Sequence, residues 1–164
     1  EVKRSYLEII SLKDLKEVQN PSSSYSLKLL DPVNFQLNKF FYKNVGKKHK
    51  WIDRLLWEES KWIEYVSNKN VKTYIFKKEN DLVGFFELLE HHEKKEIEIA
   101  YFGLLEEYHN KKLGSYLLSM AIKKSFENKI DRVWLHTCSL DHKNALNNYI
   151  ARGMKIFKTE TVIV

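Results

Sequence analysis

The sequence is poor in the residues that cross-link or interrupt a chain. Its 164 residues include one cysteine, two prolines and five glycines. The single cysteine, Cys138, excludes an intramolecular disulfide, and no repeat, low-complexity tract or flexible linker is found. No apolar run exceeds the seven residues from Ile99 to Leu105, too few to span a membrane, and the start of the chain has no signal-peptide core. These absences predict one continuous domain, residues 1–164, located in the cytoplasm and without a membrane partner.

Arginine is also scarce, although positive charge is in modest excess. The 28 lysines and arginines outweigh 22 acidic residues by a net charge of +6, but only four of the 28 are arginines. Arginine makes most of the bidentate contacts by which proteins read DNA bases and phosphates. The stretch from Lys43 to Lys50, flanked by Tyr42 and Trp51, is the best candidate for a nucleic-acid surface. A solvated lysine-rich surface explains it more simply, and we predict no nucleic-acid partner.

The N-terminal third changes from a strand pattern to a helical one. Residues 2–12 alternate as a strand does, and the serine-rich stretch after Pro21 marks a loop. Residues 25–30 are compatible with a strand or with the entry to a helix. The helical signals are a start at Asp31 and Pro32, apolar residues at near-helical spacing up to Gly46, and a second stretch from about Trp57 to Val66.

From residue 71 onward the pattern predicts the order β-β-β-α-β-α-β. The first three strands should be antiparallel, with a hairpin turn at Asn80 and Asp81 and an irregularity near Gly103, since glycine often marks a bulge. The expected elements are strands at 71–77, 82–89, 96–105, 132–137 and 155–163, an amphipathic helix at 114–128, and a short helix that Asp141 caps and Gly153 ends.

The junction from Leu104 to Tyr116 combines several features of an anion-binding site. It places unpaired backbone amides at the N-terminus of the predicted helix, where the helix dipole is positive. Lys111 and Lys112 add positive charge, and Gly114 allows a ligand to approach the backbone closely. The arrangement suits a pyrophosphate, although an ordinary strand-to-helix turn with a packing glycine has the same local pattern.

The segment from Val133 to Met154 then carries a strand and a short helix that bears Asn144 and Tyr149 in a characteristic order. In this order the chain resembles the GNAT superfamily of N-acetyltransferases, over about residues 71–164. Three further segments look like a bacterial branch of the superfamily: 84–88, 100–104 and 136–142. The resemblance implies a single α/β domain whose mixed central sheet is splayed at the cofactor site and flanked by helices. Residues 1–70 would supply an N-terminal strand and acceptor-side helices, and residues 71–164 the acetyl-CoA-binding core.

The pyrophosphate motif of the family is Gln or Arg, two residues, Gly, one residue, and Gly or Ala. The corresponding frame here runs from His109 to Gly114, and only Gly114 matches, because His109 replaces the Gln or Arg and Lys112 replaces the first glycine. Lys112 retains a backbone N–H and adds a cation, but its Cβ hinders a close approach if the turn needs a positive φ. The resemblance implies acetyl-CoA contacts at Leu104, Glu106, Asn110, Lys111, Lys112, Leu113, Gly114, Ser115 and Asn144.

Acetyl transfer requires a neutral amine, a polarised thioester carbonyl and a proton for the leaving thiolate. The resemblance implies that the Leu104 N–H contacts the thioester oxygen and that Tyr149 is the general acid. Glu98 lies eleven residues before His109, the position of a catalytic glutamate in the histone-acetyltransferase branch, and Glu87 is the alternative base. Tyr149 is also compatible with a buried core tyrosine, and the two glutamates with salt-bridged residues.

Arg54 stands among tryptophans that either pack a core or line the acceptor pocket. A guanidinium in such surroundings can hold a carboxylate of the acceptor, so Arg54 and Glu87 are the candidate substrate-binding residues. His136, Cys138 and His142 lack the spacing of a structural zinc site, and we predict no metal.

The sequence thus predicts an N-acetyltransferase that moves an acetyl group from acetyl-CoA to a primary amine by direct attack. The acceptor would be a small molecule or a peptide, and the terminal strand at 155–163 could support a homodimer. The alternative is a catalytically silent acyl-CoA-binding or protein-interaction module with the same fold.

Overall fold

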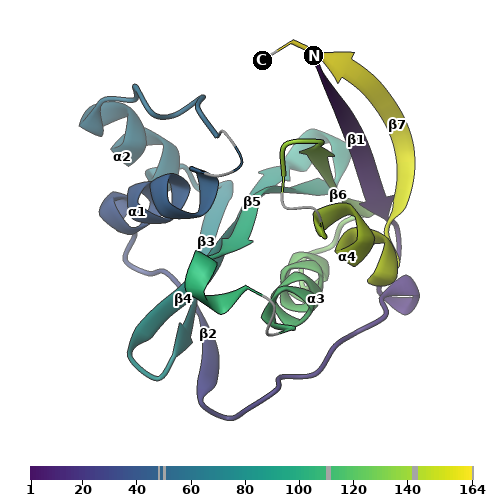
Figure 1. The fold of residues 1–164 in the computed structure, drawn as a ribbon, viewed down its shortest axis with the longest axis horizontal. Helices are drawn as coiled ribbons and strands as arrows, with labels where there is room; N and C mark the ends of the chain where they lie inside the picture. Colours follow the sequence, from purple (N-terminus) through teal and green to yellow (C-terminus); the bar gives the residue numbers. More distant parts are fainter. Residues whose placement is uncertain (48, 50, 110–111, 142–143, 164) are drawn as a thin grey trace.

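The chain forms a mixed sheet with helices on both of its faces (Figure 1). The computed structural model describes residues 1–47, 49, 51–109, 112–141 and 144–163, so Lys50, Asn110, Lys111 and His142 lie outside the described residues. The strands are β1 (Val2–Ile9), β2 (Tyr25–Leu29), β3 (Val71–Lys78), β4 (Asp81–His91), β5 (Glu96–Leu104), β6 (Arg132–Cys138) and β7 (Lys155–Val162). The α-helices are α1 (Phe35–Gly46), α2 (Glu59–Ser67), α3 (Leu113–Phe126) and α4 (Ala145–Ala151), and short 3₁₀ helices are η1 (Leu12–Asp14), η2 (His92–Lys94) and η3 (Glu106–Tyr108).

Several element ends differ from the sequence prediction because local hydrogen bonds decide them. Residues 25–29, which the sequence allowed as a strand or a helix entry, form a strand. Helix α1 begins after Asn34 rather than at Asp31, since the Asn34 side chain accepts a hydrogen bond from the Gln36 N–H at 3.1 Å. Asp141 does not cap α4: its carboxylate accepts from the Cys138 N–H at 3.0 Å and closes the turn after β6. The β3–β4 turn lies at residues 79–80, one residue earlier than predicted.

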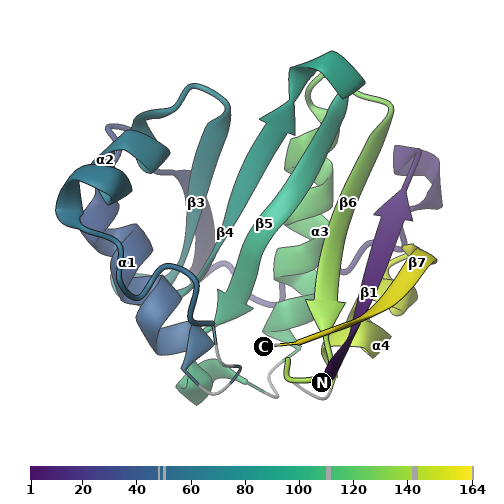
Figure 2. The same ribbon diagram turned by 90° about the horizontal axis from the view of Figure 1, so that it is seen from above.

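The sheet opens between β5 and β6. The strand order is β2-β3-β4-β5-β6-β1-β7, and the neighbours are antiparallel except β5 and β6, which are parallel. These two strands pair only through Glu96–Arg132, Ile97–Val133 and Glu98–Trp134. Figure 2 shows them diverging beyond that point. We call their unpaired ends, residues 99–104 and 135–138, the β5–β6 fork. It confirms the predicted splayed mixed sheet.

The helices divide between the two faces of the sheet. Figures 1 and 2 show α1 and α2 over β3, β4 and β5, with α3 and α4 on the opposite face. The predicted apolar stripe of α3 is the centre of the main core: Leu117, Leu118, Ala121 and Ile122 are all 0% exposed. Burying each leucine or isoleucine contributes about 1.5–3 kcal/mol, so this helix is held firmly behind the fork.

A bulge in β5 decides which residues face the helices. Glu87 pairs with Tyr101 and Leu88 with Ile99, which leaves Ala100 as the extra residue. The bulge therefore lies at Ala100 and not near Gly103, as the sequence suggested. Glu98 and Tyr101 consequently share the α1–α2 face, although they are three residues apart.

Gly103 has a different function in the fold. A Cβ on Gly103 would lie 2.4 Å from Val45 Cγ1, far inside contact distance. The glycine thus allows α1 to pack directly on β5 at the fork.

Candidate active site

One edge of β5 presents backbone N–H groups to the fork. The Leu105 N–H donates to the Val83 carbonyl at 2.8 Å, on the β4 side. Because successive N–H groups of a strand point to opposite edges, those of Leu104 and Phe102 point toward the fork. The N–H of Leu104 thus lies on the edge that the predicted oxyanion contact requires. Phe102 shares that edge, and sequence analysis missed it although strand alternation from Leu104 is enough to find it.

The N-terminus of α3 lies at the same end of the fork. Lys112 is the N-cap residue and has φ 60° and ψ 9°, a left-handed conformation, and its side chain makes no capping hydrogen bond. The first amides of the helix, including the predicted contacts Leu113, Gly114 and Ser115, have no acceptor within the helix. The turn therefore does need a positive φ at Lys112, at a cost of about 1–2 kcal/mol for a residue with a Cβ.

Gly114, at the start of α3, is not closely packed against the rest of the protein. A Cβ on Gly114 would lie 3.8 Å from both Asn148 Nδ2 and Leu104 Cδ1, which are ordinary contact distances. Packing within the protein therefore does not require glycine at this position. Asn148 holds the helix start in place, donating to the Gly114 carbonyl at 3.3 Å and accepting from the Ser115 hydroxyl at 3.1 Å. Sequence analysis did not single out Asn148.

Tyr149 approaches the fork from α4. It is 8% exposed, and its ring packs edge-on against Phe102 with the centroids 6.4 Å apart. Within the described ranges its hydroxyl makes no hydrogen bond. Burial, and then the charge of Asp141, raises the pKa of Tyr149 above its ordinary value. The hydroxyl thus stays protonated at neutral pH, which is the state a proton donor needs.

Glu98 lies at the closed end of the fork and is bound to a histidine. Its carboxylate is 3.1 Å from Nε2 of His91, and the two side chains are 16% and 35% exposed. The His91 ring stacks on Trp134, the β6 residue paired with Glu98. Glu98 is thus held on the α1–α2 face of the sheet, about 20 Å of strand away from Leu104.

The remaining predicted contacts lie in the connections around the fork. Glu106 opens η3, directly after β5, and Asn144 is the N-cap of α4. His109 contacts the Leu104 carbonyl through Nε2 at 3.1 Å, and His49, after α1, contacts the Leu140 carbonyl through Nδ1 at 3.3 Å. The latter contact brings the α1–α2 connection against the loop that follows β6.

Arg54 and Glu87 form a buried ion pair beneath α1 and α2. The guanidinium Nη1 lies 3.0 and 3.2 Å from the two carboxylate oxygens, and the side chains are 6% and 0% exposed. Glu87 also accepts from Asn38 at 2.9 Å and from the Tyr65 hydroxyl at 3.0 Å. Five aromatic rings surround the guanidinium at 4.2–5.7 Å: Tyr42, Trp57, Trp62, Tyr65 and Tyr101.

This pair corrects the expectation for the acceptor pocket. The carboxylate that Arg54 binds is Glu87 of the same chain, and neither side chain is open to a ligand in this arrangement. Burial also excludes Glu87 as a base that meets the acceptor directly. The pair instead holds α1, α2 and β4 together at the acceptor side.

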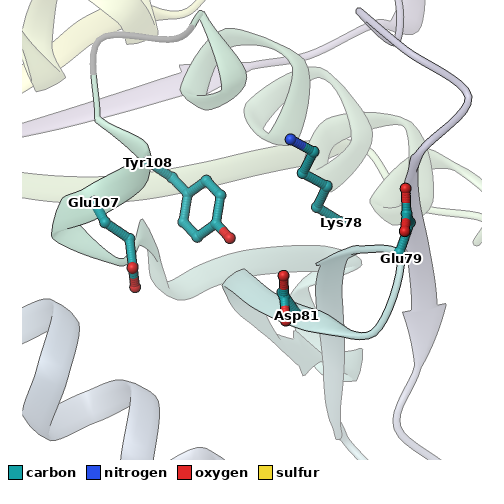
Figure 3. Close-up of a pocket in the computed structure, with 5 residues that line it drawn as sticks. All are labelled: Lys78, Glu79, Asp81, Glu107 and Tyr108. Carbon is teal, nitrogen blue, oxygen red and sulfur yellow. The ribbon is translucent and has the colours of Figure 1, made fainter.

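A surface hollow of about 470 Å³ lies beside η3 (Figure 3). Its lining is Lys78, Glu79, Asp81, Glu107 and Tyr108. Three carboxylates against one lysine disfavour a phosphate ligand, and no residue predicted for the site lines it.

Neither a metal site nor a membrane-crossing helix is found in the described part of the chain. In the ranges given for the fold, no group of three or more His, Cys, Asp and Glu side chains is placed to hold a metal ion. Among the same residues, no helix is long and apolar enough to cross a membrane.

A splayed mixed sheet, an unpaired strand edge and a helix N-terminus at one point define an α/β acyltransferase fold. The model of the acetyltransferase (GNAT) family matches residues 34–154, and the chain belongs to this family. No match was found among curated proteins.

Solved structures share the fold at low sequence identity. A GCN5-related N-acetyltransferase from Sphaerobacter thermophilus superposes with a TM-score of 0.74 at 10% identity, over 96% of this chain and 49% of its own. An aminoglycoside acetyltransferase from an uncultured soil metagenomic sample, in complex with trehalose, has a TM-score of 0.67 at 14% identity, over 81% of this chain and 90% of its own. A Bacillus subtilis acetyltransferase in complex with CoA has a TM-score of 0.59 at 18% identity, over 79% of this chain and 75% of its own. The chain spans 49–60% of the length of the first three solved structures it matches.

Proposed function

We propose that the protein transfers an acetyl group from acetyl-CoA to a primary amine of a small molecule or peptide. The observation that carries this proposal is the convergence of the α3 amides and the open edge of β5 at one end of the fork. Family membership supports acetyl transfer, and the CoA bound to the Bacillus subtilis acetyltransferase supports the donor.

The donor would be held along the fork. The amides of Lys112, Leu113, Gly114 and Ser115 suit its pyrophosphate, because they combine unpaired N–H groups with the positive end of the helix. The backbone of Leu104 and Glu106, and the side chain of Asn144, are proposed to contact the pantetheine arm, which would add to β5 as an extended strand does. Lys111 and Asn110 belong to the same predicted set.

The chemistry would take place where Tyr149 meets the open edge of β5. Acetyl-CoA supplies a thioester carbonyl, and the N–H of Phe102 or Leu104 would donate to its oxygen as negative charge develops. The ring contact between Phe102 and Tyr149 favours Phe102, because acid and oxyanion donor must serve the same thioester. Tyr149 would protonate the departing thiolate, and the carboxylate of Glu98 would face the acceptor amine.

The acceptor would approach over the α1–α2 face, which the N-terminal residues 1–70 help to form. Three of the structural neighbours are aminoglycoside acetyltransferases, two of them structures of one enzyme, which supports an amine acceptor in general. Strand β7 lies at the edge of the sheet, and we propose it as the contact of a homodimer. The cytoplasmic location stays a prediction.

The alternative, a catalytically silent acyl-CoA-binding or interaction module, is favoured by one observation. Lys112, with its long side chain, occupies the left-handed position at which the family motif has glycine. An activity assay separates the two functions.

The test incubates the protein with acetyl-CoA and a panel of primary amines: an alkyl diamine, a lysine peptide and an aminoglycoside. We expect release of free thiol together with a product that carries one added acetyl group by mass spectrometry. Gly114→Glu, which places bulk and negative charge against the helix amides, should abolish the reaction, whereas Ser60→Glu, on the exposed start of α2, should not. Acetyl-CoA binding without acetylation of any amine would favour the silent module.

A further inference from the structure

The α1–α2 face of the sheet is open over β6, β1 and β7. Figures 1 and 2 show none of the described helices on this part of the face. The residues that face outward here are aromatic and charged: Tyr6 packs against His136 with ring centroids 5.5 Å apart, against Phe157 at 6.1 Å and against Trp134 at 6.4 Å. This platform borders the fork directly.

His136 lies at the point of the platform nearest the fork. Val133 and Leu135 are buried against α3, so the alternation of β6 turns Trp134 and His136 to the open face. Trp134 forms the last β5–β6 pair, with Glu98, and His136 follows two residues later, about 7 Å further along the strand. It therefore stands where the two strands begin to separate, at the level of the Ala100 bulge, and it is exposed.

Charged groups from four parts of the chain act on His136. Desolvation of the ring by the groups packed around it, and then the positive charge of Arg4 on β1, lowers the pKa of His136 below its ordinary value. The carboxylates of Glu98 on β5, Asp141 after β6 and Asp53 in the α1–α2 connection act in the opposite direction. Three carboxylates are thus close enough to favour a positive charge on the imidazole.

We propose that His136 is the general base that takes the proton of the acceptor ammonium group, and that Glu98 is a positioning residue that stabilises the resulting imidazolium. This inference rests on the proposed function and assigns the base of that same site. Glu98 is suited to the supporting role because His91 already binds its carboxylate and because it lies on the closed side of the fork. Within the described ranges His136 makes no hydrogen bond, so its ring nitrogens remain available to a substrate.

The proposed step balances in atoms and charge. The acceptor ammonium gives one proton to the imidazole, and the freed nitrogen lone pair forms the C–N bond at the thioester carbon. The C–S bond then breaks, the sulfur takes the proton of the Tyr149 hydroxyl, and the new amide nitrogen gives its surplus proton back to Tyr149 through water. His136 releases its proton to solvent, so the net products are the amide, CoA with a free thiol and one proton.

The test compares His136→Gln with the parent and with a matched control, His92→Gln. His92 is a histidine near carboxylates too, with Glu90 at 3.3 Å, but it is 58% exposed on η2, at the end of β5 opposite the fork. With acetyl-CoA and the best amine of the panel above, we expect His136→Gln to lower kcat at pH 7 about 10²- to 10⁴-fold, with acetyl-CoA binding unchanged. His92→Gln should behave as the parent.

The pH profile identifies the role. In the parent, the acid limb of kcat/KM for the amine should have its midpoint below about 6.5, the ordinary histidine pKa. In His136→Gln this limb should disappear, and the rate should rise with pH toward the pKa of the amine itself, near 10. Added imidazole should restore activity to His136→Gly. In a separate NMR titration, the pKa of His136 should be lower in Glu98→Gln than in the parent, because a carboxylate charge is lost.

The outcomes separate the two proposals. Full activity and an unchanged acid limb in His136→Gln, with the limb lost in Glu98→Gln instead, would make Glu98 the base and overturn this inference alone. A folded parent that acetylates no amine would overturn the proposed function, and this inference with it.

Discussion

Tyr149 is the residue whose chemistry depends most directly on its surroundings. Burial and Asp141 raise its pKa, so the hydroxyl remains a proton donor throughout the neutral and mildly basic range. Tyr149→Phe keeps the ring contact with Phe102 and removes only the proton. We expect kcat to fall about 100-fold or more while KM for acetyl-CoA stays the same, as steady-state kinetics would show.

The sign of the pKa shift gives a second expectation for the parent enzyme. A tyrosine pKa raised above about 10 means that no loss of kcat between pH 8 and pH 10 should be due to Tyr149. A basic limb below pH 10 that is absent from Tyr149→Phe would show that the tyrosine ionises normally and would contradict the buried acid.

The buried ion pair between Arg54 and Glu87 should contribute strongly to the stability of the fold. Arg54→Met leaves the carboxylate of Glu87, which is 0% exposed, without its cation, and the free energy of unfolding should fall by about 3–5 kcal/mol. Adding Glu87→Gln removes the unpaired charge and keeps an acceptor for Asn38 and Tyr65, so the double variant should recover most of the loss. Denaturant unfolding of the two single variants and the double variant measures this coupling, and additive losses would contradict it.

At the scale of elements, the start of α3 combines backbone strain with the proposed pyrophosphate site. Lys112 has φ 60°, and Lys95, after η2, has φ 53°. Replacing either with glycine should raise stability by about 1 kcal/mol, because glycine adopts this conformation without the Cβ clash. In thermal unfolding that corresponds to about 2–4 °C for a protein of this size.

Only the first of these two variants should also alter ligand binding. In Lys112→Gly the pyrophosphate can approach the helix amides without a Cβ in the way, and we expect tighter acetyl-CoA binding by calorimetry. Lys95→Gly supplies the control, since it relieves the same strain at the opposite end of β5. If both variants change the Kd for acetyl-CoA equally, the conformation of Lys112 has no specific effect on the ligand site.

The order of elements was predictable because periodicity and turn residues specify it locally, as the apolar stripe of α3 and the β3–β4 hairpin show. The bulge was not predictable from Gly103, since the extra residue is Ala100 and the glycine is required by Val45 of a helix distant in sequence. The Arg54–Glu87 pair escaped prediction for the same reason: it depends on how α1 and α2 pack on β4. His136 could have been recognised only with the strand pairing that places it beside the fork, whereas strand alternation from Leu104 would have been enough to find Phe102.

For the whole molecule, the fork is the weakest joint in the sheet. One side consists of β2, β3, β4 and β5 and the other of β6, β1 and β7, and three residue pairs connect them. Both sides also pack on α3, and side-chain contacts such as the His91–Trp134 stack and the Arg132–Glu96 ion pair join them near the closed end of the fork. A ligand that lies along the open edge of β5 and against the α3 amides would therefore bind at the place where the two sides separate.

This arrangement predicts a specific pattern of protection by acetyl-CoA. At a concentration 100 times its Kd, acetyl-CoA should stabilise the folded state by about 2.7 kcal/mol, which corresponds to a rise of about 5–10 °C in Tm. Hydrogen exchange should slow at the amides of Phe102 and Leu104 and in the first turn of α3, since these donors would gain acceptors. Gly114→Glu should lose both effects while remaining folded. A rise in Tm with slower hydrogen exchange only near Tyr108, at the surface hollow, would place the ligand outside the fork. The catalytic roles assigned to residues at the fork would then lose their basis.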